Sequence, residues 1–221
     1  MGLILAFGAG TLISAVAFEL TEEAFSIGGA DAVAIGLALG ALSYFAGSLA
    51  LARRGGRTRS HPGARTGGGA ADRASALLLG AVLDGIPESA VIGISLLEGG
   101  EVGVAVLAAV FISNLPEAVS SSRDMHETGL SNRHVLSTWA IVCLVSALAA
   151  GAGFGFLDGA SNNWIAIIQA FAGGAVLTML ADTMIPDAYN AQPKYSALAR
   201  SGVGLLTVLG FALAYLLSTL E

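Results

Sequence analysis

The sequence predicts an all-α membrane protein, a helical bundle of seven transmembrane helices that forms one polytopic domain over residues 1–221. Hydrophobic residues make up 55% of the chain and charged residues only 12%, which is too apolar for an ordinary soluble domain. A helix needs roughly 20 mostly apolar residues to cross a bilayer, and windows of that length recur along almost the whole chain. The bilayer is therefore the expected solvent.

Seven windows meet this requirement, and in chain order they are 1–22, 31–52, 74–97, 101–122, 135–157, 163–186 and 201–220. The first lacks a cationic start and runs directly into Glu19 and Glu22, so it is interpreted as a span rather than a secretory signal. In the second, Gly36 and Gly40 are four residues apart and predict a close helix contact. Residues 53–73, rich in Gly and Arg, predict a disordered cytoplasmic loop.

The positive charges orient all seven spans. Every Lys and Arg falls in alternate loops, namely Arg53, Arg54, Arg57, Arg59, Arg65 and Arg73, then Arg123 and Arg133, then Lys194 and Arg200. The opposite loops carry acidic residues and no Lys or Arg. By the positive-inside rule, Met1 lies on the cytoplasmic side of the plasma (inner) membrane and Glu221 lies outside.

Two pairs of segments resemble each other along the chain. Leu83–Ser89 is similar to Ile112–Ala118, and Phe7–Phe25 is more weakly similar to Phe171–Tyr189. The members of each pair cross the membrane in opposite directions, which describes an inverted repeat of the kind found in transporters. The first span then pairs with the sixth, the third with the fourth and the second with the fifth. A helix encoded upstream of Met1 would supply a mate for the seventh and give a 3+2+3 arrangement.

Carboxylates within the third and fourth spans are the candidates for chemistry. Asp84 and Glu88 are four residues apart and so share one helix face, and Ser113 and Glu117 repeat this spacing. An ionisable residue at the centre of a spanning helix costs at least about 2.5–3.5 kcal/mol. No Lys or Arg lies within any predicted span to neutralise these acids. A cation, a proton or a shifted pKa has to do so.

A proline precedes each motif glutamate. Proline within a helix removes one backbone hydrogen bond, so Pro87 frees the carbonyl of Leu83 and Pro116 frees that of Ile112. Each motif thus combines a carboxylate, a loosened carbonyl and small polar neighbours, which predicts an oxygen-rich cation site. In the alternative interpretation, both Pro-Glu pairs are structural kinks whose glutamates are protonated and hydrogen-bonded between helices.

Other polar residues have weaker claims to a role. Glu19 and Asp182 lie nearer the ends of their spans, where structural and gating roles are equally favoured. His61, His126 and His134 fall in predicted cytoplasmic loops. Scattered histidines of this kind are more often solvated surface than metal ligands, and metal sensing is the alternative.

At the two Pro-Glu motifs the chain resembles the ZIP (Zrt/Irt-like protein) family of metal transporters, whose two central helices carry His-Asn-x-Pro-Glu-Gly-like motifs. Here the motifs read DGIPES from Asp84 and SNLPEA from Ser113. The segments FGAGTLISAVAFEL and FAGGAVLTMLADTMIPDAY are similar to that family's second and seventh helices. The resemblance thus covers nearly the whole chain, with the first family helix absent.

The resemblance implies a binuclear-type metal site between the fourth and fifth family helices, and an elevator-like movement of one helix group against the other. Glu88 and Glu117 match the motif glutamates, and Asn114 matches a ligand position. Asp84 stands where the family usually has His, and Ser113 replaces a bulkier polar ligand. Gly85 stands where Asn is frequent, so one or two metal positions are both compatible with the motif.

The predicted function is transport of a divalent metal cation such as Zn²⁺, Mn²⁺, Fe²⁺ or Mg²⁺, in the direction of import and without a cofactor. A site made only of oxygen ligands favours Mn²⁺ or Mg²⁺, although carboxylates also bind Zn²⁺. The expected partners are the lipid bilayer and the metal ion, with no nucleic acid, and a homodimer is left open. The alternatives are a degenerate scaffold or metal sensor, and an intramembrane enzyme, which no Ser/His or paired-Asp arrangement supports.

Overall fold

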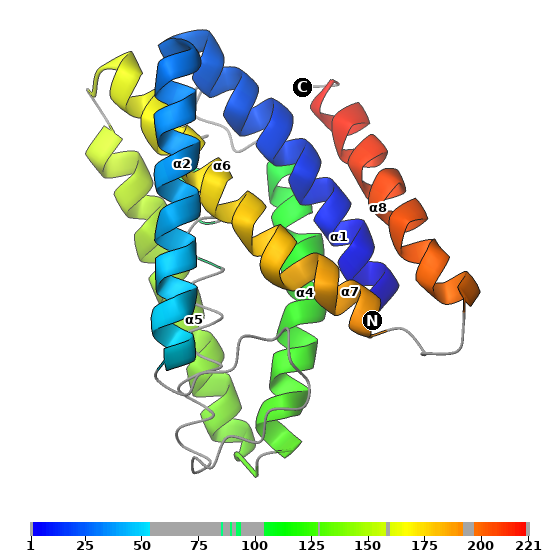
Figure 1. Ribbon diagram of the computed structural model, residues 1–221. Helices are drawn as coiled ribbons and strands as arrows, with labels where there is room; N and C mark the ends of the chain where they lie inside the picture. Colours follow the sequence, from blue (N-terminus) through cyan, green and yellow to red (C-terminus); the bar gives the residue numbers. More distant parts are fainter. Residues whose placement is uncertain are drawn as a thin grey trace.

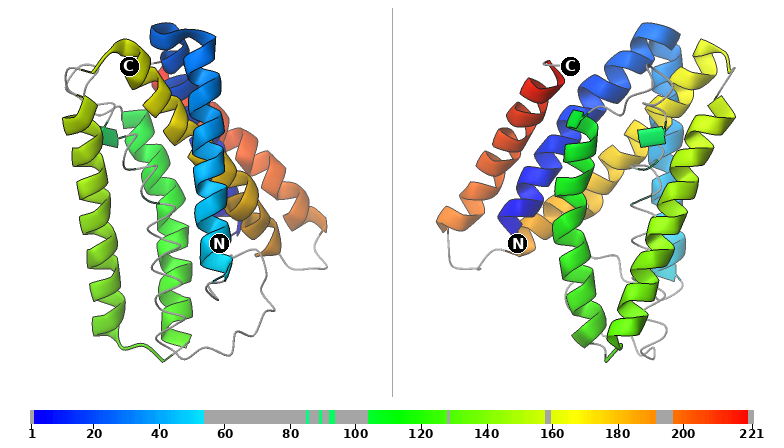
Figure 2. Two further views of the ribbon diagram at one scale, coloured as in Figure 1. Left: turned by 60° about the vertical axis from the view of Figure 1, so that its left-hand side comes forward. Right: turned by 180° about the vertical axis from the view of Figure 1, so that it is seen from behind.

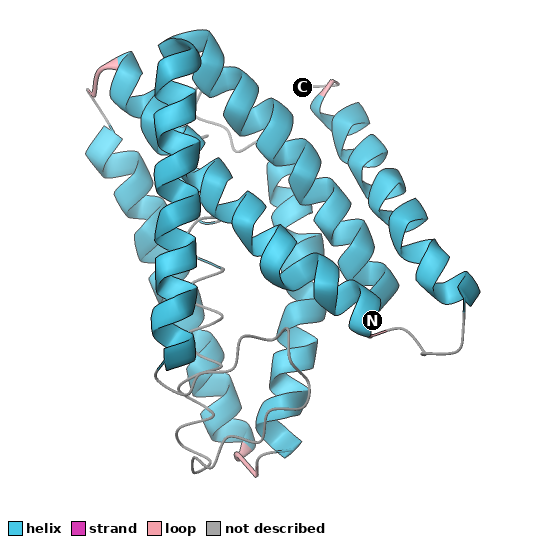
Figure 3. Ribbon diagram, in the orientation of Figure 1, coloured by secondary structure: helices cyan, strands magenta, loops and turns pink. Residues whose placement is uncertain are grey.

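The computed structural model describes residues 2–53, 85, 89, 92–93, 104–127, 129–157, 160–191 and 197–219. Helices account for nearly all of these residues, and no β-strand occurs among them (Figures 1 and 3). The prediction of an all-α protein is confirmed for this part of the chain. The predicted loop 53–73 and the predicted third span lie almost entirely outside the described residues.

Seven α-helices and two π-helical segments are described. In chain order they are α1 (Gly2–Ser14), η1 (Ala15–Glu22), α2 (Glu23–Arg53), α4 (Val104–Glu127), α5 (Asn132–Leu157), α6 (Asn162–Met179), η2 (Leu180–Met184), α7 (Ile185–Asn190) and α8 (Ala197–Ser218). Helix α1 continues through η1 into α2, and α6 continues through η2 into α7. Long helical runs therefore dominate the described architecture.

Four helical segments in the described part are long and apolar enough to cross a membrane, by length and composition: Gly2–Ala50, Asn132–Ala152, Asn162–Asn190 and Ser201–Ser218. The first has 49 residues. As a straight helix it would extend about 70 Å, more than twice the ~30 Å hydrocarbon core, so it is long enough for two crossings. Helix α4 has 24 residues but is less apolar, because it carries polar residues such as Asn114 and Glu117. A membrane protein fits these helices, and the count of seven spans stays a prediction.

The chain breaks its helical path at Gly29, within α2. Its φ of 74° and ψ of −177° lie outside the helical region and divide α2 into two limbs. Just before the break, the Ser26 hydroxyl donates to the Glu23 carbonyl oxygen at 2.8 Å. The two predicted spans 1–22 and 31–52 are thus joined by a helical connection with a break at a single residue.

Replacing Gly29 by alanine is expected to lower stability by about 1–3 kcal/mol, because this combination of φ and ψ is essentially restricted to glycine. An added Cβ would meet nothing within 4 Å, so the cost is that of the backbone alone. The measurement is thermal unfolding in detergent micelles. Gly155→Ala on α5 is the matched control, since its Cβ also meets nothing within 4 Å and its φ is not positive. Equal melting temperatures for the two variants would contradict the expected strain.

Most of the described helices pack into one unit, here called the crossed-helix group: α1, η1, α2, α6, η2, α7 and α8. Within it α2 packs along α6, and α1 packs along α8 (Figures 1 and 2). Its interior is a cluster of buried apolar side chains, here called the core cluster, which includes Leu12, Val16, Tyr44, Val176, Met179 and Leu180. Helices α1, α2 and α6 all contribute to this cluster, so it holds the group together.

Glycines bring the α1 and α8 backbones into direct contact. A Cβ at Gly10 would overlap the carbonyl oxygen of Thr207, and a Cβ at Gly210 would overlap that of Phe7. The contact is reciprocal, because Gly10 follows Phe7 by three residues on α1 and Gly210 follows Thr207 by three residues on α8. Larger side chains at these positions would push the two helices apart.

The α2–α6 pair repeats this arrangement. A Cβ at Gly40 would overlap the carbonyl oxygen of Phe171, and a Cβ at Gly174 would overlap that of Leu37. Gly36 lies against the carbonyl oxygen of Ile167 in the same interface. The prediction of a helix contact at Gly36 and Gly40 is confirmed.

Helices α4 and α5 form an antiparallel hairpin, seen from behind in the right-hand view of Figure 2. Together with the described residues of segment 85–93 they are here called the hairpin group, although α4 packs more closely along α1 than along α5 in the described part of the chain. A Cβ at Gly93 would overlap the Ala150 carbonyl oxygen of α5, so this segment also touches α5 by its backbone. Val110 of α4 and Ile92 pack against the core cluster. The two groups therefore meet where α4 packs along α1 and where these apolar side chains reach the core cluster.

Candidate metal centre

Three of the predicted ligands, Ser113, Asn114 and Glu117, lie on α4. The helix continues without interruption through Pro116. Because proline has no backbone N–H, the carbonyl of Ile112 lacks its usual helical partner. The loosened carbonyl predicted from sequence therefore occurs within a continuous helix.

The amide of Asn114 is half-buried, and its Nδ2 donates to the Val110 carbonyl oxygen at 2.8 Å. Asn114 follows Val110 by four residues, so the two share one face of α4. Val110 packs against the core cluster, which places this face toward the crossed-helix group. Positions 113 and 117, three and seven residues after Val110, belong to the same face by helical periodicity. The predicted α4 ligand positions thus lie where the two groups meet.

The other two predicted ligands, Asp84 and Glu88, lie outside the described residues. The residues that directly follow them are described. A Cβ at Gly85 would lie 3.3 Å from the Ser146 hydroxyl of α5, and Ser89 is only 9% exposed. Gly85 therefore lies beside α5 of the hairpin group.

The predicted gate residues lie in the crossed-helix group, one in each π-helical segment. Glu19 is half-buried in η1, and Asp182 is exposed in η2. Short π-helical segments within α-helices are rare and occur frequently at functional sites. The π-helical segments place both acids on the group that faces the α4 ligand positions.

Among the described residues, no three His, Cys, Asp or Glu side chains gather into a group that could hold a metal ion. Of the five predicted ligands, only Asn114 has a described side chain. The predicted ligand set therefore stays a prediction.

Sequence reasoning concentrated on charged residues and missed several buried polar ones. Thr11, Ser14 and Gln169 are each no more than 2% exposed within the crossed-helix group, and Ser89 is also buried. The Thr11 hydroxyl donates to the Gly8 carbonyl oxygen at 2.8 Å. A Gln in the apolar first half of the predicted span 163–186 was the available signal for Gln169.

Two of the three histidines lie at the ends of α4 and α5 nearest the turn between them. His126 and His134 are both exposed, as expected for solvated loop histidines, and His61 lies outside the described residues.

No family model matches this chain, and no curated protein matches it. The resemblance to the ZIP family therefore stays a prediction from the two motifs.

Proposed function

We propose that this protein is a divalent metal cation transporter of the plasma (inner) membrane, related to the ZIP family. It binds Zn²⁺, Mn²⁺, Fe²⁺ or Mg²⁺ between Asp84, Glu88 and Glu117, with Ser113 and Asn114 assisting. The observation that carries the proposal is the pair of Pro-Glu motifs in predicted spans that contain no Lys or Arg. A bound cation supplies the charge that these intramembrane carboxylates need.

The position of α4 supports this proposal. The face that carries Asn114 meets the crossed-helix group, so an ion held there lies between the two groups. A substrate site at the boundary between two helix groups is what alternating access requires, because each side can then be exposed in turn. Glu19 and Asp182, on the opposite group, are the residues proposed for a gating or pathway role.

The packing also supports an elevator-like movement. Glycine contacts tie α1 to α8, α2 to α6, and segment 85–93 to α5 by their backbones. Between the groups, Val110 and Ile92 make side-chain contacts with the core cluster. A rigid-body shift of the hairpin group would exchange these apolar contacts together with the close packing of α4 along α1, while the glycine contacts within each group persist.

The reciprocal glycine contacts favour an inverted repeat with a pairing different from the one predicted. On α1, Phe7 and Gly10 contact α8, and on α6, Phe171 and Gly174 contact α2 in the same way. Both α1 and α6 also continue into a π-helical segment. The unit α1–α2 then corresponds to the unit α6–α8. This makes the second predicted span the counterpart of the seventh, and leaves the fifth, α5, without one.

Uptake of Zn²⁺, Mn²⁺, Fe²⁺ and Mg²⁺ into proteoliposomes tests the proposed function, with protein-free liposomes as the control. Saturable uptake of at least one ion is the expected result. Absence of uptake for all four, with the protein inserted and folded, would contradict the transporter and favour the scaffold or sensor.

Asp84→His is expected to raise the ratio of Zn²⁺ to Mn²⁺ uptake several-fold, because imidazole is a softer ligand than a carboxylate. The measurement is competition between the two ions in the same vesicles. Asp31→His, at an exposed position near the start of the second limb of α2, introduces the same side chain outside the site and serves as the control. If the variant and the parent have the same metal profile, Asp84 does not contact the ion.

A further inference from the structure

The turn between α4 and α5 is closed by a regular helix cap. Gly129 has a φ of 86°, and its N–H donates to the His126 carbonyl oxygen at 2.9 Å. The N–H of Leu130 donates to the Met125 carbonyl oxygen at 3.2 Å. A left-handed glycine with these two bonds ends α4 and directs the chain into α5.

The His126 side chain bridges the two helices across this turn. Its Nδ1 lies 2.8 Å from the Ser122 carbonyl oxygen of α4, and its Nε2 lies 2.6 Å from Oδ1 of Asn132, the first residue of α5. Both of these oxygens are hydrogen-bond acceptors. Only the protonated imidazolium carries an N–H at each ring nitrogen and can donate to both.

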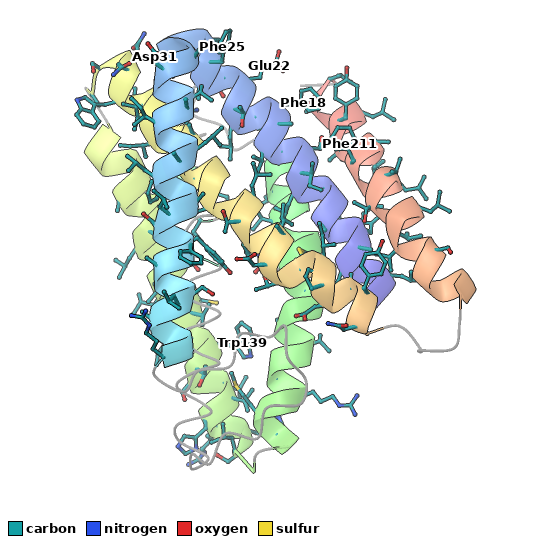
Figure 4. The ribbon with its side chains drawn as sticks, viewed as in Figure 1. Phe18, Glu22, Phe25, Asp31, Trp139 and Phe211 are labelled. Carbon is teal, nitrogen blue, oxygen red and sulfur yellow. The ribbon has the colours of Figure 1, made fainter. Side chains whose placement is uncertain are left out.

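Ser122 is also tied to α5 by its side chain. The indole Nε1 of Trp139, labelled in Figure 4, donates to the Ser122 hydroxyl at 2.8 Å. The carbonyl and the hydroxyl of one α4 residue are thus both engaged at the junction with α5. Ser122 lies five residues after Glu117, which is about 7.5 Å along the helix axis.

We propose that His126 is a positioning residue, whose imidazolium clasps α4 to α5 and holds the Glu117 end of the metal site in place, so that pH on the side of this turn regulates metal binding. This inference rests on the proposed function for its effect on transport. The clasp itself, made by His126, Ser122 and Asn132, rests on the hydrogen bonds alone.

The direction of the pH effect follows from the same bonds. The Ser122 carbonyl, and then Asn132, raise the pKa of His126 above its ordinary value. His126 is exposed and lies beyond the predicted span 101–122. Because the folded-state pKa is raised, the clasp is complete below the ordinary pKa and is lost as the pH rises through the raised one. Deprotonation leaves one ring N–H for two acceptor oxygens, so with the Asn132 amide oriented as described, one of the two hydrogen bonds of the clasp is lost.

Other charged groups belong to the same two helix ends. They are Arg123, Asp124 and Glu127 on α4, and Arg133 and His134 on α5. His134 is the matched comparison for His126, because its Nδ1 bonds the Ser131 hydroxyl at 2.9 Å within its own helix end. It should therefore leave the α4–α5 junction unchanged when it is replaced.

Fluorescence of Trp139 tests the clasp without any need for transport. The chain has two tryptophans, so a Trp164→Phe background leaves Trp139 as the sole reporter beside Ser122. A pH titration in detergent should show a transition above about 6.5, the ordinary histidine value. His126→Gln should abolish the transition, and His134→Gln should keep it. Asn132→Asp should move it to higher pH, because a carboxylate only accepts and adds a negative charge. A titration unaffected by His126→Gln would overturn the clasp.

Metal uptake into proteoliposomes tests the regulatory effect. The pH is the same on both sides of the membrane, and the ion is whichever of the four is taken up fastest in the assay of the proposed function. The apparent KM should rise several-fold as the pH passes through the fluorescence midpoint, and His126→Gln should remove this dependence. Proton competition at the carboxylate ligands has the opposite sign, since it weakens as pH rises. A KM that does not follow His126 overturns the regulation. A chain that takes up no metal refutes the proposed function, whereas the fluorescence titration still decides the clasp.

Discussion

Glu88→Ala and Glu117→Ala are each expected to lower metal uptake more than tenfold while leaving membrane insertion intact. Each substitution removes a charged ligand from the proposed site and adds no buried charge. A tenfold loss corresponds to about 1.4 kcal/mol, which is modest for removing one of three carboxylates from a divalent cation. The measurement is the initial uptake rate in proteoliposomes that contain equal amounts of reconstituted protein.

Two further variants make this result specific. Glu22→Ala removes an exposed acid from η1 and should transport normally. Glu117→Gln preserves size and hydrogen bonding, so it should be tolerated if Glu117 is a protonated structural residue and inactive if Glu117 is a metal ligand. Normal uptake by Glu88→Ala and Glu117→Ala would refute the site assignment.

Gly210→Ala is expected to destabilise the fold by about 1–3 kcal/mol, the usual cost of overpacking. The added Cβ would overlap the Phe7 backbone of α1 and would force α8 away from it. The melting temperature in detergent should fall by about 2–4 °C for each kcal/mol. Gly40→Ala should do the same to the α2–α6 contact, because its Cβ would overlap the Phe171 backbone.

Gly204→Ala is the matched control for this prediction. It lies on the same helix, α8, but a Cβ there meets nothing within 4 Å. Alanine has the higher helix propensity, so this variant should be neutral or slightly more stable. If Gly204→Ala and Gly210→Ala melt at the same temperature, the backbone contact between α1 and α8 is wrong.

Much of the candidate site could be predicted from spacing. Asn114 and Glu117 lie on a helix as expected, and the positions on α4 share a face because helical periodicity is a local property. That this face meets the core cluster was not predictable, since it depends on residues of α1, α2 and α6 far away in the chain. The proposed clasp at His126 was missed because one histidine in a predicted loop has no distinguishing sequence pattern.

By itself, the sequence determined that the described chain is helical and apolar enough for a membrane, and that Gly36 and Gly40 lie in a helix contact. These properties follow from composition and short spacings, which act within one segment. Only the tertiary structure decided that Gly29 and Gly129, among the described glycines, take a positive φ, and that α1 pairs with α8 and α2 with α6. The physical reason is that pairing depends on which backbones can approach each other. The backbones of α1 and α8 approach each other because Gly10 and Gly210 both lack a side chain, and these two glycines are 200 residues apart in the chain.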